Sequence, residues 1–284
     1  MDWTTTREPA LHASLLHWAT SQPDATFVRD IQSGDTLTYH ECLRAVQQFQ
    51  RWLGPAPRAI VLALPASNVT AVVWLAALTG GHRLIPCSPD CTPHELTHLF
   101  RAHHPDLMVL DDANQQFGAA LAEISSPALE TITRARLSAA IAQWASQDDL
   151  ENPPEPRDGA LNLTTSGTTG EPKSVSLRAG QIAWTAEQIR ISHHLTTADR
   201  GLAVLPFFHI NAPVVSLCAT LQAGGAVVLA PRFSRSRFWS WIADESITWA
   251  SIVPTILALL LQSDGPATPP PTLRFVRTAS APLP

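Results

Sequence analysis

The sequence predicts an α/β protein with two stacked, doubly wound and mainly parallel sheets flanked by helices. Short apolar runs that suit buried strands alternate along the chain with longer segments of helical periodicity, as in parallel βαβ units. Three such helix–strand steps occur before residue 115, and more follow an acidic, proline-containing connector at 148–158. With 284 residues, 45% of them hydrophobic, the chain can bury one or two sizeable cores. We expect a first α/β subdomain over 1–190, and a second over 191–284 that is incomplete at its C-terminus.

The first subdomain is expected to begin with a hairpin and to continue as alternating helices and strands. Ser33-Gly34-Asp35 is a turn signal between two strand-like runs. Thr38 and Glu41 match a capping box, followed by apolar residues at helical spacing. Strands are expected at 26–31, 36–39, 59–64, 84–87 and 107–110, and helices after Thr38 and at 68–78 and 93–102.

The second part repeats the alternation beyond the connector. Strands are expected at 175–177, 201–206, 225–230, 248–253 and 273–277, and helices at 181–193, 214–221, 238–244 and 255–261. A proline-rich loop at 263–272 precedes the last strand.

Composition narrows the choice of partners and compartment. The formal net charge of −5 gives no basic footprint, so no nucleic-acid partner is expected. The four cysteines form no Cys-x-x-Cys pair, which favours reduced thiols in a cytoplasmic protein. The N-terminus shows no export signal, and the apolar run at 69–79 is too short for a membrane span.

One segment, residues 164–173, has the composition of a phosphate-binding loop. It follows a strand-like run, consists of Thr, Ser and Gly, and closes with Glu-Pro-Lys. Backbone N–H groups and hydroxyls in such a loop suit an anion, and Lys173, the only lysine in the chain, adds a point charge. The spacing is not that of the common nucleotide loop, and Gly-Thr-Thr-Gly alone also suits a flexible turn. The candidate phosphate-binding residues are Thr165, Ser166, Gly167, Thr168, Thr169, Gly170 and Lys173.

This segment resembles the phosphate loop of the AMP-forming adenylate-forming enzymes, which include acyl- and aryl-CoA synthetases, peptide-synthetase adenylation domains and luciferases. Their pattern is Thr-Ser-Gly-Thr-Thr-Gly-x-Pro-Lys-Gly, and Ser174 replaces the last glycine here. Segments at 37–43, 79–89, 205–212 and 275–283 resemble further family blocks, in family order. The stretches 233–239, 248–249 and 253–255 look most like the oxalate–CoA ligase branch.

The resemblance implies ATP-dependent activation of a carboxylic acid to an acyl-adenylate, with release of pyrophosphate. A thiol, from CoA or from the phosphopantetheine of a carrier protein, would then take the acyl group. ATP, Mg²⁺ and CoA are thus the expected cofactors, and a small carboxylic acid the expected substrate. The phosphate loop would hold the β- and γ-phosphates.

His209 follows the strand expected at 201–206, at the edge where open parallel sheets bind ligands. A lone histidine among aromatic residues has a structural role by default. The corresponding histidine of the family lies beside the carboxylate channel, so the resemblance implies a catalytic, gating or positioning role for His209.

Two other functions remain open from the residues. His94-Glu95-Leu96-Thr97-His98 matches the helical His-Glu-x-x-His signature of zinc hydrolases. A family helix with Pro-x-Glu-Leu occupies this place, which favours surface histidines and no bound zinc. A module that binds nucleotide without catalysis is the other alternative.

Family members continue beyond the segment at 275–283 into adenine- and ribose-binding residues and a C-terminal domain with a catalytic lysine. This sequence contains none of these. We therefore expect residues 1–284 to be an N-terminal fragment without adenylation activity of its own, because the reacting phosphate is enclosed by both parts.

Overall fold

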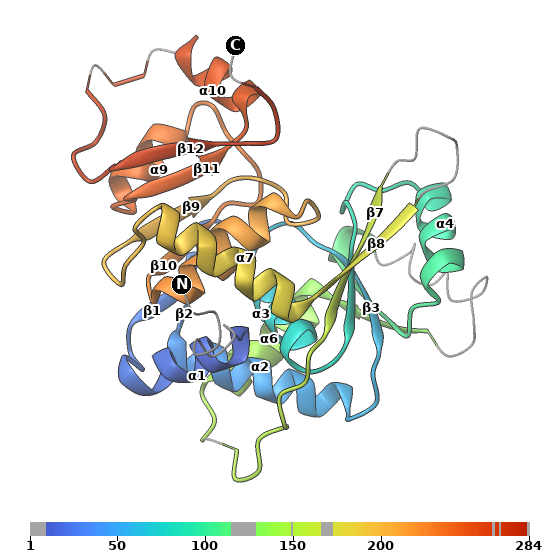
Figure 1. Ribbon diagram of the computed structural model, residues 1–284. Helices are drawn as coiled ribbons and strands as arrows, with labels where there is room; N and C mark the ends of the chain where they lie inside the picture. Colours follow the sequence, from blue (N-terminus) through green and yellow to red (C-terminus); the bar gives the residue numbers. More distant parts are fainter. Residues whose placement is uncertain are drawn as a thin grey trace, which may run out of the picture.

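The strands form two six-stranded sheets in the part of the chain that is described (Figure 1). The computed structural model describes residues 10–114, 129–148, 150–165, 173–262, 265–266 and 268–282. Sheet A has the order β12 (Phe275–Thr278), β11 (Trp249–Ile252), β9 (Arg200–Ala203), β10 (Ala226–Leu229), β1 (Thr26–Asp30) and β2 (Thr36–Thr38). Sheet B has the order β6 (Glu130–Thr133), β5 (Leu107–Leu110), β3 (Ala59–Ala63), β4 (Arg83–Pro86), β7 (Ala160–Thr165) and β8 (Lys173–Arg178). All pairs are parallel except those of the edge strands β2 and β8, which confirms the predicted fold class.

The helices connect and cover these strands. They are α1 (Leu11–Ser21), α2 (Tyr39–Leu53), α3 (Asn68–Thr79), α4 (Pro93–His103), α6 (Arg134–Ala145), α7 (Ala179–Ser192), α8 (Ala219–Ala223), α9 (Phe238–Asp244) and α10 (Pro254–Leu261), with a 3₁₀ turn, η1 (Asp112–Asn114), and a π-helix, η2 (Ala212–Cys218). The sequence patterns do not predict α1, β6 or α6. Among the described residues, no helix combines the length and apolar character needed to cross a membrane.

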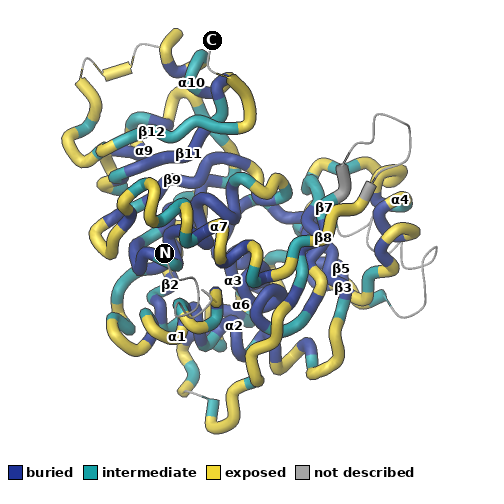
Figure 2. Tube along the Cα trace, viewed as in Figure 1, coloured by how far each residue is buried: buried dark blue, intermediate teal, exposed yellow. Residues whose placement is uncertain are grey.

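Helix α3 joins the two sheets into one core. Ser67 caps its start, accepting the Thr70 N–H at 3.2 Å, and every residue of the helix is buried. A helix that is apolar on all sides must be covered on all sides. Accordingly, α3 contacts β1 of sheet A and β3, β4 and β7 of sheet B, and it lies among the dark-blue segments of Figure 2. One apolar cluster therefore includes Val28 of sheet A and Leu62 of sheet B.

The capping box predicted at Thr38 and Glu41 is present, and a second helix begins with a capping box that the sequence analysis did not predict. At α2, the Thr38 hydroxyl accepts the Glu41 N–H at 3.2 Å, and Glu41 Oε2 accepts the Thr38 N–H at 2.7 Å. Helix α4 begins with a second box, formed by Thr92 and Glu95, and covers the outer face of sheet B with Leu96, Leu99 and Phe100.

The sheets do not follow the order of the chain. Strand β1 pairs in parallel with β10, with Val28 opposite Val227, so the N-terminal hairpin completes sheet A. The division into 1–190 and 191–284 stays a prediction of domain organisation. Sheet A draws strands from both ranges, whereas all six strands of sheet B lie within 1–190.

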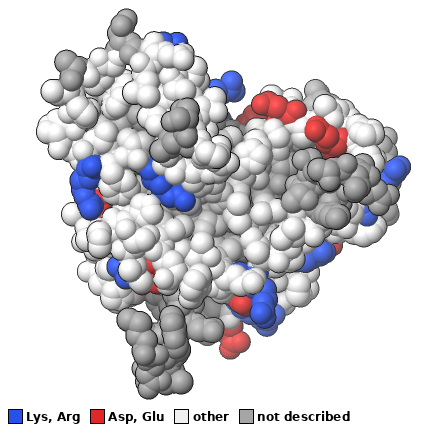
Figure 3. Space-filling view, turned by 45° about the horizontal axis from the view of Figure 1, so that its top comes forward, with Lys and Arg blue, Asp and Glu red and all other residues white. Residues whose placement is uncertain are grey.

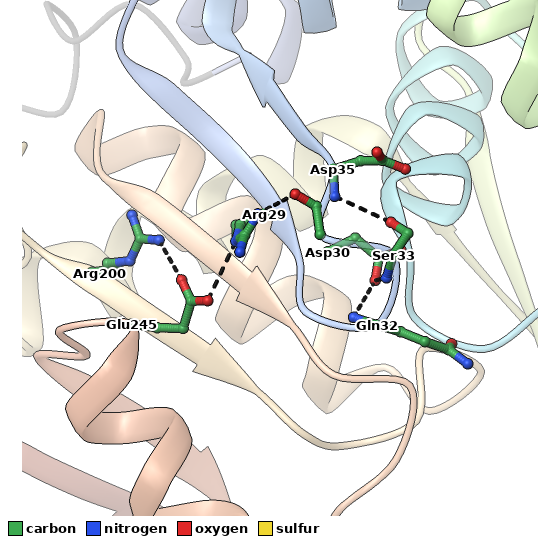
Figure 4. A network of polar contacts seen from close by, with 8 residues as sticks. Arg29, Asp30, Gln32, Ser33, Asp35, Arg200 and Glu245 are labelled. Carbon is green, nitrogen blue, oxygen red and sulfur yellow. Dashed lines mark hydrogen bonds and ion pairs between the residues drawn. The ribbon is translucent and has the colours of Figure 1, made fainter.

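An ion cluster joins β1 of this hairpin to β9 within sheet A (Figure 4). Glu245 accepts from Arg29 of β1 at 3.3 Å and from Arg200 of β9 at 2.8 Å, and its side chain is 14% exposed. The turn itself is closed by Asp30, whose Oδ1 accepts the Gln32 N–H at 2.9 Å. One carboxylate thus connects strands that are far apart in the sequence. Over the face seen in Figure 3, the charges of the described residues are scattered and form no continuous basic stripe.

Candidate active site

A hairpin at one edge of sheet B frames the predicted phosphate loop. Strand β7 ends at Thr165 and β8 begins at Lys173, and these two residues form the last pair of the antiparallel ladder. The pairing is fixed by Asn162, which is 8% exposed and accepts from the Ser176 hydroxyl at 3.0 Å. A one-residue slip would turn this buried polar side chain to the opposite face. The ends of the loop are therefore held in one register.

The position of this hairpin suits ligand binding. Strand β7 runs parallel to β4, so its last residue lies at the carboxyl edge of the sheet, where open α/β sheets bind ligands. Of the predicted phosphate-binding residues, Thr165 and Lys173 are placed by their backbones as the ends of the two strands. Ser166, Gly167, Thr168, Thr169 and Gly170 lie outside the described residues.

His209 lies beyond the carboxyl end of β9, in sheet A. Its N–H donates to the Pro206 carbonyl at 3.1 Å, and its own carbonyl accepts from Ala212 at 3.2 Å. These turns lead directly into η2, and π-helices occur often at functional sites. The imidazole is exposed and lies 4.5 Å from the Phe208 ring, centroid to centroid. No hydrogen bond in the described residues joins His209 to the β7–β8 hairpin, so its predicted role stays a prediction.

A polar network beside His209 is a feature that the sequence analysis did not single out. Arg277, the third residue of β12, donates from Nη1 to Asn211 Oδ1 and to Ser251 Oγ, both at 3.2 Å. Asn211 Nδ2 in turn donates to Ser280 Oγ at 3.2 Å. Burial lowers the pKa of the Arg277 guanidinium from its ordinary value, yet an arginine stays charged in proteins. Within the described residues it has only neutral partners.

Ser280 adds a second sign of function at this edge. Its φ of 75° lies in the left-handed region, which residues other than glycine seldom adopt. Such backbone strain gathers at ligand-binding positions. The sequence signal that could have identified the network is an arginine directly after the apolar pair Phe275-Val276 in a predicted strand.

The histidine motif on α4 has no third zinc ligand beside it among the described residues. His94 and His98 are exposed and their Nε2 atoms are 3.3 Å apart. Glu95, the expected general base, instead accepts the Thr92 N–H at 2.7 Å and the Thr92 hydroxyl at 2.9 Å. These bonds lower the pKa of Glu95. The described residues contain no group of three metal-ligating side chains.

Comparisons with known proteins decide the family. A model of the AMP-binding enzyme family matches residues 15–284. The chain belongs to this family. The resemblance found in the sequence is thereby confirmed. The β7–β8 hairpin and the turn after β9 belong to an AMP-binding enzyme family member.

Curated members of the AMP-binding family with similar sequences are CoA ligases. The sulfoacetate–CoA ligase of Cupriavidus necator is 34% identical over 274 residues, which cover 94% of this chain and 53% of that protein. The oxalate–CoA ligase of Arabidopsis thaliana is 41% identical over 142 residues, covering 49% of this chain and 27% of that protein. The chain thus spans about half the length of the sulfoacetate–CoA ligase, and less of the oxalate–CoA ligase is matched.

Solved structures of the family share the fold. ATP-bound MatB from Rhodopseudomonas palustris matches with a TM-score of 0.82 at 23% identity, covering 98% of this chain and 56% of that one. The N-terminal domain of FACL13 from Mycobacterium tuberculosis matches with a TM-score of 0.85 at 21% identity, covering 97% and 71%.

Proposed function

We propose that this chain is part of an acid–thiol ligase that activates a carboxylic acid with ATP and transfers the acyl group to CoA or to a carrier-protein phosphopantetheine. The observation that carries the proposal is the β7–β8 hairpin. Its strands reach the carboxyl edge of sheet B at Thr165 and Lys173, and the sequence of the segment 164–173 is the phosphate-loop candidate of a member of the AMP-binding family. The CoA ligases among its relatives support the same chemistry.

The first step joins the acid to AMP. A carboxylate oxygen attacks the α-phosphorus of ATP, the bond between the α-phosphorus and the bridging oxygen breaks, and pyrophosphate leaves. In the second step a thiol attacks the acyl carbon and AMP leaves. Such phosphoryl chemistry depends mainly on positioning and charge neutralisation. The loop N–H groups, its hydroxyls and Lys173 would bind the departing phosphates.

Mg²⁺ is expected to be held chiefly by the phosphates of ATP. Mg²⁺ usually binds through one or two carboxylates and substrate phosphates, and keeps several waters. The described residues offer no cage of three ligating side chains, so we assign no step to the ion.

The acid would lie at the carboxyl edge of sheet A, between His209 and Arg277. A guanidinium binds a carboxylate through two parallel hydrogen bonds, and Arg277 has no acidic partner among the described residues. His209 can donate to a second oxygen. Arg277 would bind a second anionic group of the acid while His209 donates to the carboxylate that reacts, and two relatives are named for oxalate and sulfoacetate, which carry such a group.

Acid-dependent exchange of radiolabelled pyrophosphate into ATP tests this function, with the longest natural form of the protein and a panel of acids. We expect exchange with oxalate, malonate or sulfoacetate and little with acetate or long-chain acids. Arg277→Gln should reduce kcat/KM for the dianionic acid at least tenfold, while Arg101→Gln, an exposed arginine on α4, should leave it unchanged. ATP binding without acid-dependent exchange would instead favour a non-catalytic nucleotide-binding module.

A further inference from the structure

A cavity of about 330 Å³ lies at the amino edge of sheet B, opposite the edge that carries the β7–β8 hairpin. His82, which directly precedes β4, lines this cavity together with Arg51 of α2 and Arg157 of the connector before β7. Gln50 and Glu155 complete its polar wall. None of these residues belongs to the proposed ligase site.

A backbone hydrogen bond fixes the tautomer of His82. Its side chain is 1% exposed, and its Nδ1 accepts the backbone N–H of Arg58 at 3.1 Å. The other ring nitrogen, Nε2, must therefore carry the proton. No hydrogen bond from Nε2 is formed within the described residues. Burial, with Arg58 and Arg157 nearby, lowers the pKa of His82 to about 4, so the ring is neutral at pH 7.

Two of the lining residues are exposed arginines without an ionic partner among the described residues. Arg51 Nη2 donates to the Asn152 carbonyl at 3.1 Å, and Arg157 Nη1 donates to the Pro55 carbonyl at 2.9 Å. Neither forms an ion pair with a described residue. Each guanidinium has five N–H donors, so most of them remain available.

The backbone places Arg157 at the cavity. Its N–H donates to the Thr79 carbonyl at 2.8 Å, and it bridges to Gly80. Gly81 has a φ of +79°, and a Cβ there would lie 2.9 Å from the Cβ of Arg157. The lack of a side chain at Gly81 thus allows the connector to lie close against the start of β4.

We propose that this cavity binds a phosphate group, either as inorganic phosphate or as part of a phosphate monoester. The guanidinium forks of Arg51 and Arg157 match the oxygens of a phosphate, and His82 donates a third, uncharged hydrogen bond. Two arginines against the single carboxylate of Glu155 give the wall a net positive charge at neutral pH. The volume exceeds that of phosphate alone and leaves room for the organic part of a small monoester.

Isothermal titration with inorganic phosphate tests the site. The titrations use the whole chain carrying Lys173→Ala, so that the phosphate loop contributes little. We expect Arg157→Gln in this background to raise the Kd at least tenfold. His82→Asn, which can keep an acceptor for the Arg58 N–H but has no donor at the position of the His82 Nε2, should raise it about threefold. Arg101→Gln is the matched control and should leave the Kd unchanged. Thermal melting of each variant checks that it is folded.

Glucose 6-phosphate and glucose separate the two sources of the phosphate group. A lower Kd for the ester than for phosphate, with no binding of glucose, indicates a monoester, and the reverse order indicates inorganic phosphate. Equal Kd values for Arg157→Gln and Arg101→Gln, or no phosphate binding in the Lys173→Ala background, would overturn the proposal. Neither outcome bears on pyrophosphate exchange, which tests the ligase function separately.

Discussion

A single buried carboxylate, Asp199, is expected to be a main stabilising contact of sheet A. It is 3% exposed and precedes β9. Its Oδ2 accepts the Thr196 N–H at 2.9 Å, and its Oδ1 accepts the Thr248 hydroxyl at 2.8 Å and a hydrogen bond from Arg274. Thr248 precedes β11 and Arg274 precedes β12, so one side chain connects the amino ends of three neighbouring strands.

We predict that Asp199→Asn lowers the free energy of unfolding by about 3 kcal/mol at pH 7. A hydrogen bond to a charged partner contributes about 1.5–3 kcal/mol, and a buried donor left unpaired costs about 1–3 kcal/mol. The asparagine has one acceptor oxygen and would set its NH₂ against one of the donors. Arg274 is 44% exposed and can be rehydrated, which keeps the loss below the upper sum.

Urea unfolding of the two proteins measures this difference, with Asp24→Asn, an exposed aspartate, as the control. Burial alone would raise the pKa of Asp199, but hydrogen bonds from Arg274, Thr248 and Thr196 outweigh it and the pKa is lowered. The stabilisation is thus complete above the ordinary aspartate pKa of about 4 and is lost as the pH falls below it. A difference under about 1 kcal/mol at pH 7, or one that grows as the pH falls from 5 to 3, would refute this reasoning.

Three further outcomes are expected. Lys173→Ala should weaken ATP or pyrophosphate binding by about 1.5–3 kcal/mol in calorimetric titration, since it removes a charge-assisted contact, and equal affinities would remove the loop from the site. Gly201→Ala should cost about 1–3 kcal/mol in urea unfolding, because its Cβ would lie 2.8 Å from the buried Trp249 ring; an unchanged midpoint would show that the ring can move. Elemental analysis after dialysis should find well under one zinc per chain, because no third ligand lies beside His94 and His98 among the described residues; one zinc that is lost in His98→Ala would revive the hydrolase hypothesis.

Local sequence rules predicted the elements whose boundaries depend on local contacts. Helix α2 begins at its capping box, and α3 begins after Ser67, because these hydrogen bonds join residues three apart. The helix expected at 214–221 is instead η2 followed by α8. Its apolar residues are buried on all sides, so periodicity gives no sign of the wider π-helical turn.

The order of strands could not be predicted in the same way. Strand β1 lies beside β10 because Val28 and Val227 share the core, and nothing near either residue in the sequence indicates the other. The contact between Asn211 and Arg277 is equally distant. Family resemblance located the loop and His209, whereas Arg277 and the His82 cavity required coordinates.

The two halves of the proposed site belong to different sheets. The packing between the sheets therefore determines their relative position. The predicted phosphate loop follows β7 of sheet B in the sequence, and His209 follows β9 of sheet A. Helix α3 is buried throughout and contacts both sheets, and a close-packed interior transmits displacement instead of absorbing it. Its Trp74 is among the largest fully buried side chains. In the proposed site, the distance between the carboxylate and the α-phosphorus would therefore be set by the core around α3 more than by the connecting loops.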